Sequence, residues 1–271
     1  MAYWVLKVIL TPILRVLYRV KVEGRANVPR KGPVILASNH QSFIDSIFLV
    51  LSVNRRVTFV AKAEYFESRK TAWFFRAVGM IPLKREGGSA SERALAAARE
   101  VLLAGGVLGI YPEGTRSPDG RLYKGHTGVA RLAMQCGAPV VPVAQFGTAE
   151  VQPIGVVRPK VFKRVQLKMG ERINIPARGP QDPPPTSEDL RRCTDAIMAA
   201  IGELSGQERV DAYAKRDRGK LAAPGSDAEP DPRGLEAARA AAVAASTTPV
   251  AVVTADGAVT TPAPGPAAPS P

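Results

Sequence analysis

Between residues 33 and 170, short β-rich runs alternate with stretches that favour helix. The runs are PVILAS (33–38), VTFVA (57–61), MIPL (80–83), VLGIYP (107–112), PVVPVAQF (139–146) and VQLKMG (165–170). The clearest helix between them, over 89–106, has a serine cap, an alanine- and leucine-rich interior and a Gly-Gly end. This alternation predicts an α/β fold with a mostly parallel central sheet flanked by helices. Ligands bind beyond the carboxyl ends of the strands in such sheets.

Residues 1–22 are apolar with basic residues at intervals, as in an amphipathic helix. Lys7 and Arg15 fall on the other side from a broad apolar face of Val5, Ile9, Ile13, Val16, Leu17 and Val20. The uncharged run between the two bases is too short to span a membrane, and no signal-peptide cleavage site follows. We expect a helix in the membrane interface, with Tyr3, Trp4 and Tyr18 in the headgroup layer. The alternative is a helix that packs on the protein's own core.

The end of the chain differs in composition from the rest. From residue 221 onward it is rich in Ala, Pro, Ser and Thr and has no aromatic residue, so it cannot bury enough apolar surface to fold. We therefore expect an N-terminal helix (1–22), a catalytic domain (23–215) and a disordered tail (216–271).

The chain is strongly basic, with 37 Lys and Arg against 24 Asp and Glu and a net charge of +13. Such a charge favours an anionic partner, which can be a nucleic acid, an anionic membrane face or a phosphorylated substrate. A nucleic-acid module interleaves aromatic residues with its bases. Here the aromatic residues are only 6% and lie largely in apolar runs, so we expect no nucleic-acid partner. The two cysteines form no metal-spaced array, and we expect no metal site.

The motif NHQSFID (39–45) follows the run PVILAS and contains His40, one of only two histidines. Asp45 lies five positions later, which on an ideal helix is about 140° beyond a full turn. The two side chains therefore meet only if His40 lies in the turn after a strand and Asp45 in the first turn of the next helix. The pattern Ser42-x-x-Asp45 predicts a helix start there. In the simpler interpretation Asp45 only caps that helix and His40 is an ordinary loop residue.

A second polar cluster, YPEGTRS (111–117), follows the run that begins at residue 107. Its glycine, hydroxyl groups and Arg116 can hold a phosphate, although a solvated turn is the plainer interpretation. Lys62 and Arg85 also follow strand-like runs. Cations at three strand ends and a histidine at a fourth indicate a shared anionic site.

The sequence lacks a GxSxG elbow, a Walker loop and a GxGxxG motif. A histidine and an aspartate without a protein nucleophile suit direct base catalysis, in which the substrate's own hydroxyl attacks.

Five motifs in order, NHxxxxD, FVAK, GMIPLKR, YPEGTRS and GAPVVPV, resemble those of the 1-acylglycerol-3-phosphate acyltransferases, most of all the bacterial branch. The resemblance spans about residues 20–170. It implies a glycerolipid acyltransferase-like fold. It also implies transfer of an acyl group from acyl-CoA or acyl-carrier protein to the sn-2 hydroxyl of lysophosphatidic acid, which gives phosphatidic acid.

The resemblance also implies roles for individual residues. His40 is the general base and Asp45 orients it. The predicted phosphate site comprises Lys62, Arg85, Glu113, Gly114, Thr115 and Arg116, with Glu113 and Gly114 shaping the loop and Glu113 holding Arg116 or a substrate hydroxyl. Pro139 and Pro142 are expected to line the acyl or donor pocket. No cofactor beyond the acyl donor is expected.

Two alternatives remain open from the sequence. A sibling acyltransferase with another lyso-lipid or glycerol-3-phosphate as acceptor carries the same NHxxxxD motif, and a noncatalytic basic membrane-binding or nucleic-acid-binding protein fits the charge. The substrate lipids and the basic runs at 158–168 and 215–220 predict a peripheral protein on the cytoplasmic face of the cell membrane. The second histidine, His126, matches no motif of the family and is expected at the surface or at a helix start.

Overall fold

The computed structural model describes residues 2–62, 80–83, 88–179 and 181–215, and the short segments 252–253 and 259–260. The chain forms two compact units, residues 1–221 and 222–271. In the second unit, β10 (Val252–Val253) and β11 (Val259–Thr260) pair in antiparallel orientation. The rest of the predicted tail lies outside the described residues.

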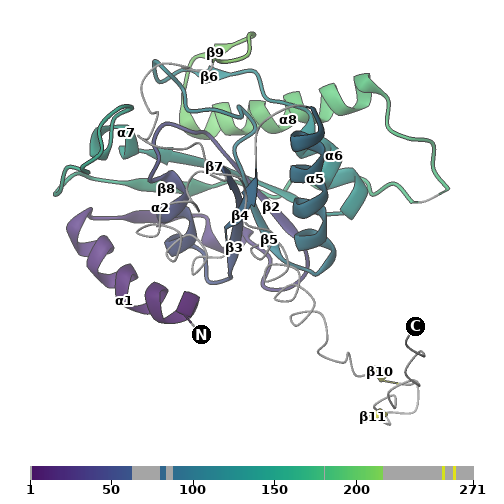
Figure 1. The fold of residues 1–271 in the computed structure, drawn as a ribbon, viewed down its shortest axis with the longest axis horizontal. Helices are drawn as coiled ribbons and strands as arrows, with labels where there is room; N and C mark the ends of the chain where they lie inside the picture. Colours follow the sequence, from purple (N-terminus) through teal and green to yellow (C-terminus); the bar gives the residue numbers. More distant parts are fainter. Residues whose placement is uncertain are drawn as a thin grey trace, which may run out of the picture. The chain divides into compact units, whose positions relative to one another are not determined.

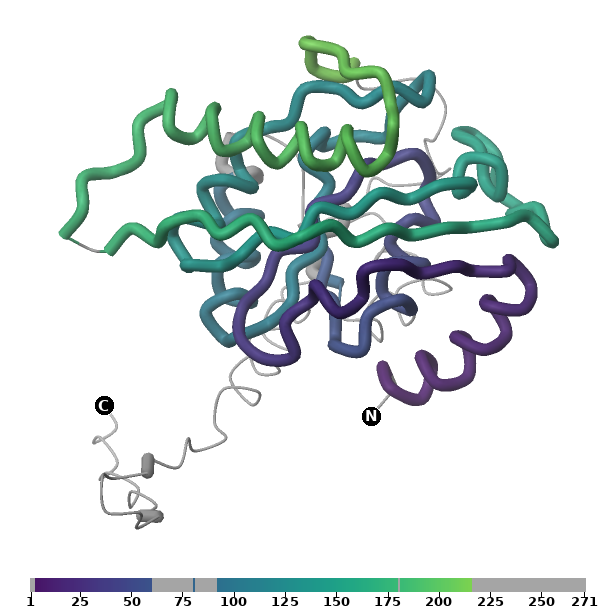
Figure 2. Tube along the Cα trace, turned by 180° about the vertical axis from the view of Figure 1, so that it is seen from behind, coloured from purple at the N-terminus to yellow at the C-terminus, as the bar shows by residue number. Residues whose placement is uncertain are grey.

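In the described part of the first unit, one sheet has the strand order β1-β8-β7-β2-β5-β3-β4 (Figure 1). The strands are β1 (Lys21–Glu23), β2 (Val34–Ser38), β3 (Val57–Lys62), β4 (Ile81–Leu83), β5 (Val107–Ile110), β7 (Val140–Phe146) and β8 (Gln166–Met169). Strands β7, β2, β5, β3 and β4 are mutually parallel. Strand β8 runs antiparallel to β7, and β1 pairs in parallel with β8 (Figure 2). The predicted α/β fold with a mostly parallel sheet is confirmed.

All six β-rich runs form strands of this sheet. Strand β2 is buried at every position, because a parallel strand covered on both faces has no polar side. The sequence analysis did not find the short strand β1, which has only three residues and lies at the sheet edge. It also missed β6 (Leu122–Tyr123) and β9 (Arg209–Val210), which form a separate two-stranded pair.

Helices pack on both faces of the sheet. They are α1 (Ala2–Leu17), α2 (Asp45–Ser52), α5 (Gly88–Leu103), α6 (Gly128–Cys136), α7 (Thr148–Val151) and α8 (Ser187–Ser205). Helices α1 and α2 share one core with Leu36 of β2. Helices α5, α6 and α8 share the other core with the adjacent residue Ile35. Neighbouring residues of β2 belong to different cores because successive side chains of a strand point to opposite faces.

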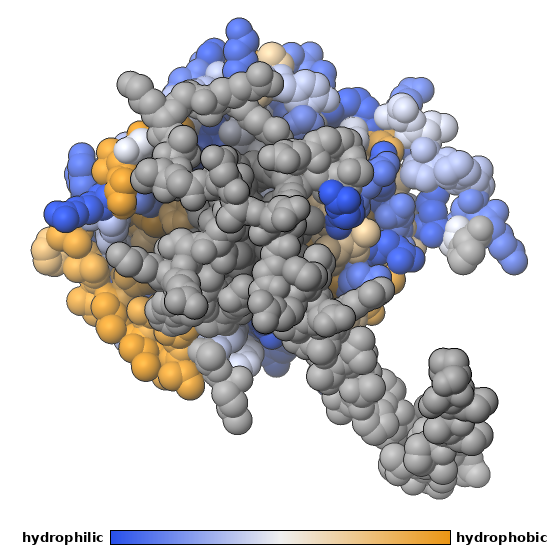
Figure 3. All heavy atoms as spheres, viewed as in Figure 1, coloured by the Kyte–Doolittle hydropathy of each residue, from blue (hydrophilic) through white to orange (hydrophobic). Residues whose placement is uncertain are grey.

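Helix α1 is packed on one side and exposed on the other. Tyr3 and Tyr18 are buried in the core, and the Tyr18 ring meets the Phe48 ring edge-on at a centroid distance of 5.3 Å. The expectation that both tyrosines lie in a headgroup layer is therefore wrong, because their rings fill the interface between α1 and the sheet. The other side of α1 exposes Trp4, Val5, Val8, Ile9, Ile13 and Val16, which form the apolar surface at the lower left of Figure 3.

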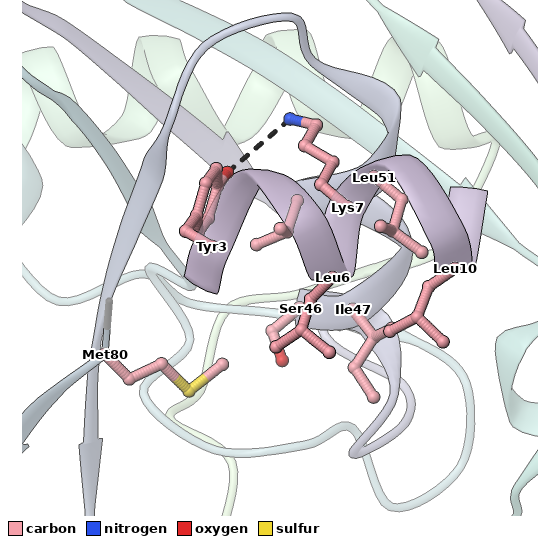
Figure 4. Close-up of a pocket in the computed structure, with 9 residues that line it drawn as sticks. Tyr3, Leu6, Lys7, Leu10, Ser46, Ile47, Leu51 and Met80 are labelled. Atoms are coloured by element: carbon pink, nitrogen blue, oxygen red, sulfur yellow. Dashed lines mark hydrogen bonds between the residues drawn. The ribbon is translucent and has the colours of Figure 1, made fainter. Parts of the chain in front are cut away.

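Lys7 lies on the packed side of α1. Its ammonium group donates to the backbone carbonyls of Val53 and Arg55, just after the end of α2, and lies 3.5 Å from the Tyr3 hydroxyl (Figure 4). Cations are stabilising near a helix carboxyl end, where the backbone carbonyls carry partial negative charge. Burial, with a smaller contribution from Arg25, lowers the pKa of Lys7 to about 8. Around this contact, α1 and α2 enclose an apolar pocket lined by residues that include Leu6, Leu10, Ile47, Leu51 and Met80.

None of the helices in the described residues combines the length and the apolar character needed to cross a bilayer. The two sides of α1 thus differ in what they can contact. One side is part of the protein core, and the other is an apolar surface without protein cover in the described structure.

Tyr18 and Val16 test this division, because they are two residues apart and are 4% and 81% exposed. Tyr18→Ala should lower the free energy of unfolding by about 3–5 kcal/mol, since it removes a buried aromatic ring. Val16→Ala should change it by no more than about 0.5 kcal/mol. Urea titration followed by circular dichroism measures both. Equal losses in the two variants would contradict this packing of α1.

Candidate active site

His40 and Asp45 meet at the carboxyl end of β2. His40 lies in the turn after the strand, Asp45 is the first residue of α2, and His40 Nδ1 is 2.8 Å from Asp45 Oδ2. Asp45 is fully buried, whereas the His40 side chain is 18% exposed. This is the geometry that the five-residue spacing requires. It leaves Nε2 as the imidazole nitrogen that can act on a substrate.

The Asp45 carboxylate also holds the turn itself. Its Oδ2 atom accepts hydrogen bonds from the backbone amides of Gln41 (2.7 Å) and Ser42 (2.9 Å). The Ser-x-x-Asp pattern predicts that the Ser42 hydroxyl caps α2, but it does not. It donates instead to the backbone carbonyl of Gln152 (2.7 Å). Only the Asp45 half of a capping box is therefore formed. Asp45 thus both caps the start of α2 and pairs with His40, and it does so through the same oxygen atom.

The loop of residues 111–117, which follows β5, forms hydrogen bonds with both the backbone amide and the backbone carbonyl of His40. The His40 amide donates to Glu113 Oε1 (3.1 Å), and the His40 carbonyl accepts from the Ser117 amide (2.7 Å). Gly114 makes the turn possible because its φ of 70° lies in the left-handed region, which glycine adopts without strain. Strand β5 pairs directly with β2, so the two motifs lie at neighbouring strand ends.

Glu113 is buried, and both of its carboxylate oxygens are taken by backbone amides. Oε1 accepts from His40, and Oε2 accepts from Tyr123 at 3.0 Å. Burial raises the pKa of Glu113 to about 7, although these two amide hydrogen bonds oppose the shift. The carboxylate therefore fixes the shape of the loop. It does not hold Arg116, as one form of the sequence expectation had it.

Tyr111 covers one face of the His40 ring. The two rings are stacked, with centroids 3.8 Å apart and planes inclined by 10°. Burial raises the pKa of the Tyr111 phenol well above its usual value, and the negative charge of Asp45 adds to this effect. The Tyr111 ring is thus uncharged, and its stacking keeps the imidazole in the orientation in which it contacts Asp45. The sequence analysis missed this role, because Tyr111 reads simply as the last apolar residue of a strand.

Asn39 ties the turn that carries His40 to β7. Its Nδ2 donates to the backbone carbonyl of Gln145 (3.1 Å) and to Gln207 Oε1 (2.8 Å), and its Oδ1 accepts from the Gln145 amide (2.8 Å). The side-chain amide thereby continues the sheet pairing for one position beyond Ser38. The only sequence signal for this network is a polar residue, Gln145, inside an otherwise apolar run.

The second histidine lies close to the same loop. The His126 amide donates to the backbone carbonyl of Pro112 (2.8 Å), and a side-chain carbon at Gly114 would lie 3.0 Å from His126 Cδ2. The His126 ring is exposed and stacks on Tyr213 at a centroid distance of 4.7 Å. It is thus a neighbour of the 111–117 loop, which its position in the sequence did not indicate.

The remaining predicted site residues fall into three groups. Thr115 and Arg116 are half-buried in the loop next to Glu113. Lys62 is the last residue of β3 and lies, like His40, at the carboxyl ends of the parallel strands. Arg85 lies outside the described residues.

The two prolines are not brought to His40. Pro139 precedes β7 at the amino end of the parallel strands, the opposite end from the turn that carries His40. Pro142 pairs with Ala37 in the middle of the sheet, and its ring lies near Gly170.

The Glu113 carboxyl predicts a specific dependence of stability on pH. Its folded pKa lies above the usual 4.5, so its contribution to stability is complete below pH 4.5 and is lost as the pH rises to about 7. The loss should reach about 3 kcal/mol at most. Urea unfolding at a series of pH values measures it against Glu113→Gln, which should lack this part of the pH dependence. Parallel curves for the two proteins would contradict the prediction.

Comparisons with known proteins cover the segment that carries these residues. The model of the acyltransferase family, described as "Acyltransferase", matches residues 19–145, which contain both motifs. A chloroplastic 1-acyl-sn-glycerol-3-phosphate acyltransferase of Arabidopsis thaliana is 35% identical over 139 residues, 51% of this chain and 39% of the relative. The Bacillus subtilis (strain 168) 1-acyl-sn-glycerol-3-phosphate acyltransferase is 27% identical over 192 residues, 69% of this chain and 89% of the relative. The chain spans only about two fifths of the length of the plastid relative.

A solved structure extends the likeness to three dimensions. The 1-acyl-sn-glycerophosphate acyltransferase PlsC from Thermotoga maritima is 32% identical, with a TM-score of 0.53, and the match covers 68% of this chain and 71% of that one. The family model covers the segment that carries His40, Asp45 and the 111–117 loop, and the solved structure is similar in sequence and fold over about two thirds of the chain. The chain therefore belongs to the acyltransferase family of the 1-acylglycerol-3-phosphate acyltransferase type.

Proposed function

We propose that this protein transfers an acyl group from a thioester donor to the sn-2 hydroxyl of 1-acylglycerol-3-phosphate, which gives phosphatidic acid for phospholipid biosynthesis. The observation that carries the proposal is the 2.8 Å contact between His40 Nδ1 and buried Asp45 at the ligand-binding edge of the sheet. The printed names of the relatives supply the acceptor, and the chemistry of the site supplies the reaction type.

The contact with Asp45 favours one tautomer of His40. A carboxylate only accepts hydrogen bonds, so Nδ1 carries the proton and Nε2 keeps its lone pair. Nε2 then takes the proton of the acceptor hydroxyl. The contact with Asp45 and the stacked Tyr111 ring restrict the imidazole to one orientation. A positioned base of this kind contributes about 10²–10⁴ in rate.

The reaction balances without an acyl-enzyme. The acceptor oxygen attacks the thioester carbonyl carbon as its proton moves to His40 Nε2. When the tetrahedral intermediate collapses, the C–S bond breaks and the departing thiolate takes that proton back. Asp45 stabilises the imidazolium between the two steps. The donor can be acyl-CoA or acyl-carrier protein, since both present a thioester, and no further cofactor takes part in these steps.

We assign the acceptor phosphate to the basic residues near His40 at the carboxyl ends of the parallel strands. Arg116 lies in the loop that brackets His40, and β3 ends at Lys62 beside β5. A guanidinium donates a forked pair of hydrogen bonds to a phosphate. Gly114 and Thr115 shape the loop between Glu113 and Arg116. Arg85 completes the assignment from the family pattern.

The acceptor and the product of this reaction are both membrane lipids, and we infer peripheral attachment to the cytoplasmic leaflet. The exposed apolar side of α1 is suited to lie in the interface of a bilayer. The net charge of +13 favours a leaflet of anionic lipids. Attachment through α1 brings the enzyme to a lyso-lipid that is itself held in that leaflet.

His40→Ala should reduce acyl transfer by at least about 10²-fold, because it removes the proposed base. His126→Ala should retain most of the activity, since the ring contacts Tyr213 and the loop but is not paired with Asp45. Transfer of labelled acyl groups by the purified variants, with circular dichroism as a check on folding, measures both effects. If only His126→Ala loses activity, His126 is the base and the assignment to His40 is wrong.

Arg116→Ala should raise the KM for the phosphorylated acceptor by about 10- to 100-fold, which corresponds to a charge-assisted hydrogen bond. The KM for the acyl donor should change far less. Steady-state kinetics with each substrate varied in turn separates the two constants, and Arg131→Ala on α6 is a matched control. If both constants rise alike, Arg116 does not bind the acceptor phosphate.

A further inference from the structure

The connection between α7 and β8, residues 153–164, exposes an unusual number of apolar side chains. Val157 and Phe162 are 78% and 72% exposed, and Ile154, Val156 and Val161 are exposed as well. Phe162 also has a φ of 61°, in the left-handed region where a bulky residue is strained. Five exposed apolar residues within twelve positions are unfavourable in water. A strained backbone that keeps an aromatic ring outside the protein indicates that this ring has a partner.

The connection has a fixed shape. The Gln152 side-chain amide donates to the backbone carbonyls of Val156 (3.1 Å) and Val157 (2.9 Å). The Lys160 amide donates to the carbonyl of Val151 (2.7 Å). Because these bonds close the base of the loop, its apolar residues are presented together rather than along a free strand of chain. We call residues 153–164 the apolar loop.

The charge of the apolar loop identifies the kind of partner. It contains no acidic residue and four basic ones: Arg158, Lys160, Lys163 and Arg164. Apolar tips among lysines and arginines match the interface of an anionic bilayer, where rings and aliphatic chains enter the acyl region and cations stay at the headgroups. A protein partner with an apolar face would gain no binding energy from four cations unless that face also carried acidic residues.

The apolar loop lies next to the carboxyl end of α1. The Val165 amide donates to the carbonyl of Tyr18 (3.1 Å), and the Lys21 amide donates to the carbonyl of Val165 (3.0 Å). Phe162 is three residues from this junction and Val16 is two, so at most about 11 Å and about 7 Å of chain separate them from it. In Figure 1 the loop extends beyond β8 at the left, next to the end of α1.

The base of the apolar loop also contacts the catalytic turn. The Ser42 hydroxyl donates to the carbonyl of Gln152, the residue that clamps the loop. Two residues before Ser42, the backbone of His40 is held by the 111–117 loop. A short chain of buried contacts thus runs from the apolar loop to the base.

We propose that the apolar loop inserts into the same anionic leaflet as α1 and is a second membrane contact, which sets the height and tilt of the catalytic turn over the lipid surface. The proposal rests on the proposed acyl transfer to a membrane-held acceptor. One helix alone leaves the protein free to rotate about the helix axis. A second contact next to the end of α1, bonded to the turn of His40, removes that freedom.

Insertion is tested with Phe162→Trp on vesicles of equimolar phosphatidylglycerol and phosphatidylcholine that carry brominated acyl chains. Bromine quenches tryptophan on contact, so this variant should show more quenching than the unsubstituted protein, whose own tryptophans give the background. Leu103→Trp is the matched control, because Leu103 is also exposed but lies on α5, which packs on the opposite face of the sheet. No added quenching in Phe162→Trp overturns the proposal.

The role of the contact is tested with the double variant V157S/F162S. It should bind these vesicles about tenfold more weakly, as expected for the loss of inserted apolar area. It should lose transfer to a vesicle-held acceptor while it keeps transfer to the same acceptor dispersed in detergent. Unchanged vesicle binding and transfer overturns the proposal and leaves the proposed function intact. If the unsubstituted protein transfers no acyl group in detergent, the proposed function fails, whereas the quenching result still decides insertion.

Discussion

The structure of the site depends on the Asp45 carboxylate more than on any other group. A single oxygen, Oδ2, accepts from the imidazole of His40 and from two backbone amides of the turn that carries it. The same atom therefore shapes the turn and orients the His40 imidazole. Because Asp45 is fully buried, water does not compete for these bonds. The three donors offset part of the cost of removing the carboxylate from water, since they all bond to Oδ2 and the buried Oδ1 accepts no hydrogen bond in the described structure. The parallel sheet then places this turn beside the loop after β5.

Much of this arrangement could be predicted from the sequence, since the strands are short apolar runs and the polar motifs follow them directly. The meeting of His40 and Asp45 follows from spacing and local structure alone. The partners of Ser42, Asn39 and Glu113 could not be predicted. Each bonds to backbone groups that come from distant parts of the chain, and a backbone group leaves no mark in the sequence. Tyr111 was missed for a related reason, because its ring serves the core and the site at once.

Helix α1 shows how one amphipathic pattern meets two environments. The pattern predicted an apolar side and a basic side, but the buried tyrosines and Lys7 lie on the side that packs on the protein. A lysine can occupy such a place because the carbonyl groups after α2 replace the water that its ammonium loses. The exposed aliphatic residues are then left for another apolar phase. The periodicity of a helix indicates that two faces exist, and only the tertiary structure decides which face each environment receives.

The reversal of direction between β7 and β8 has a consequence for how such enzymes diverge. An antiparallel pair is joined at one edge of a sheet, so its connection need not cross over a face, as a parallel pair requires. The connection here leaves the sheet at the carboxyl ends of the parallel strands. Its base is fixed, because Val151 belongs to the core and Gln152 bonds to the loop, whereas its outer part is exposed. Changes of length therefore cost less in the outer part than in the base. Under the proposed membrane contact, the outer part of this connection can therefore vary with the composition of the bilayer while His40 and Asp45 stay unchanged.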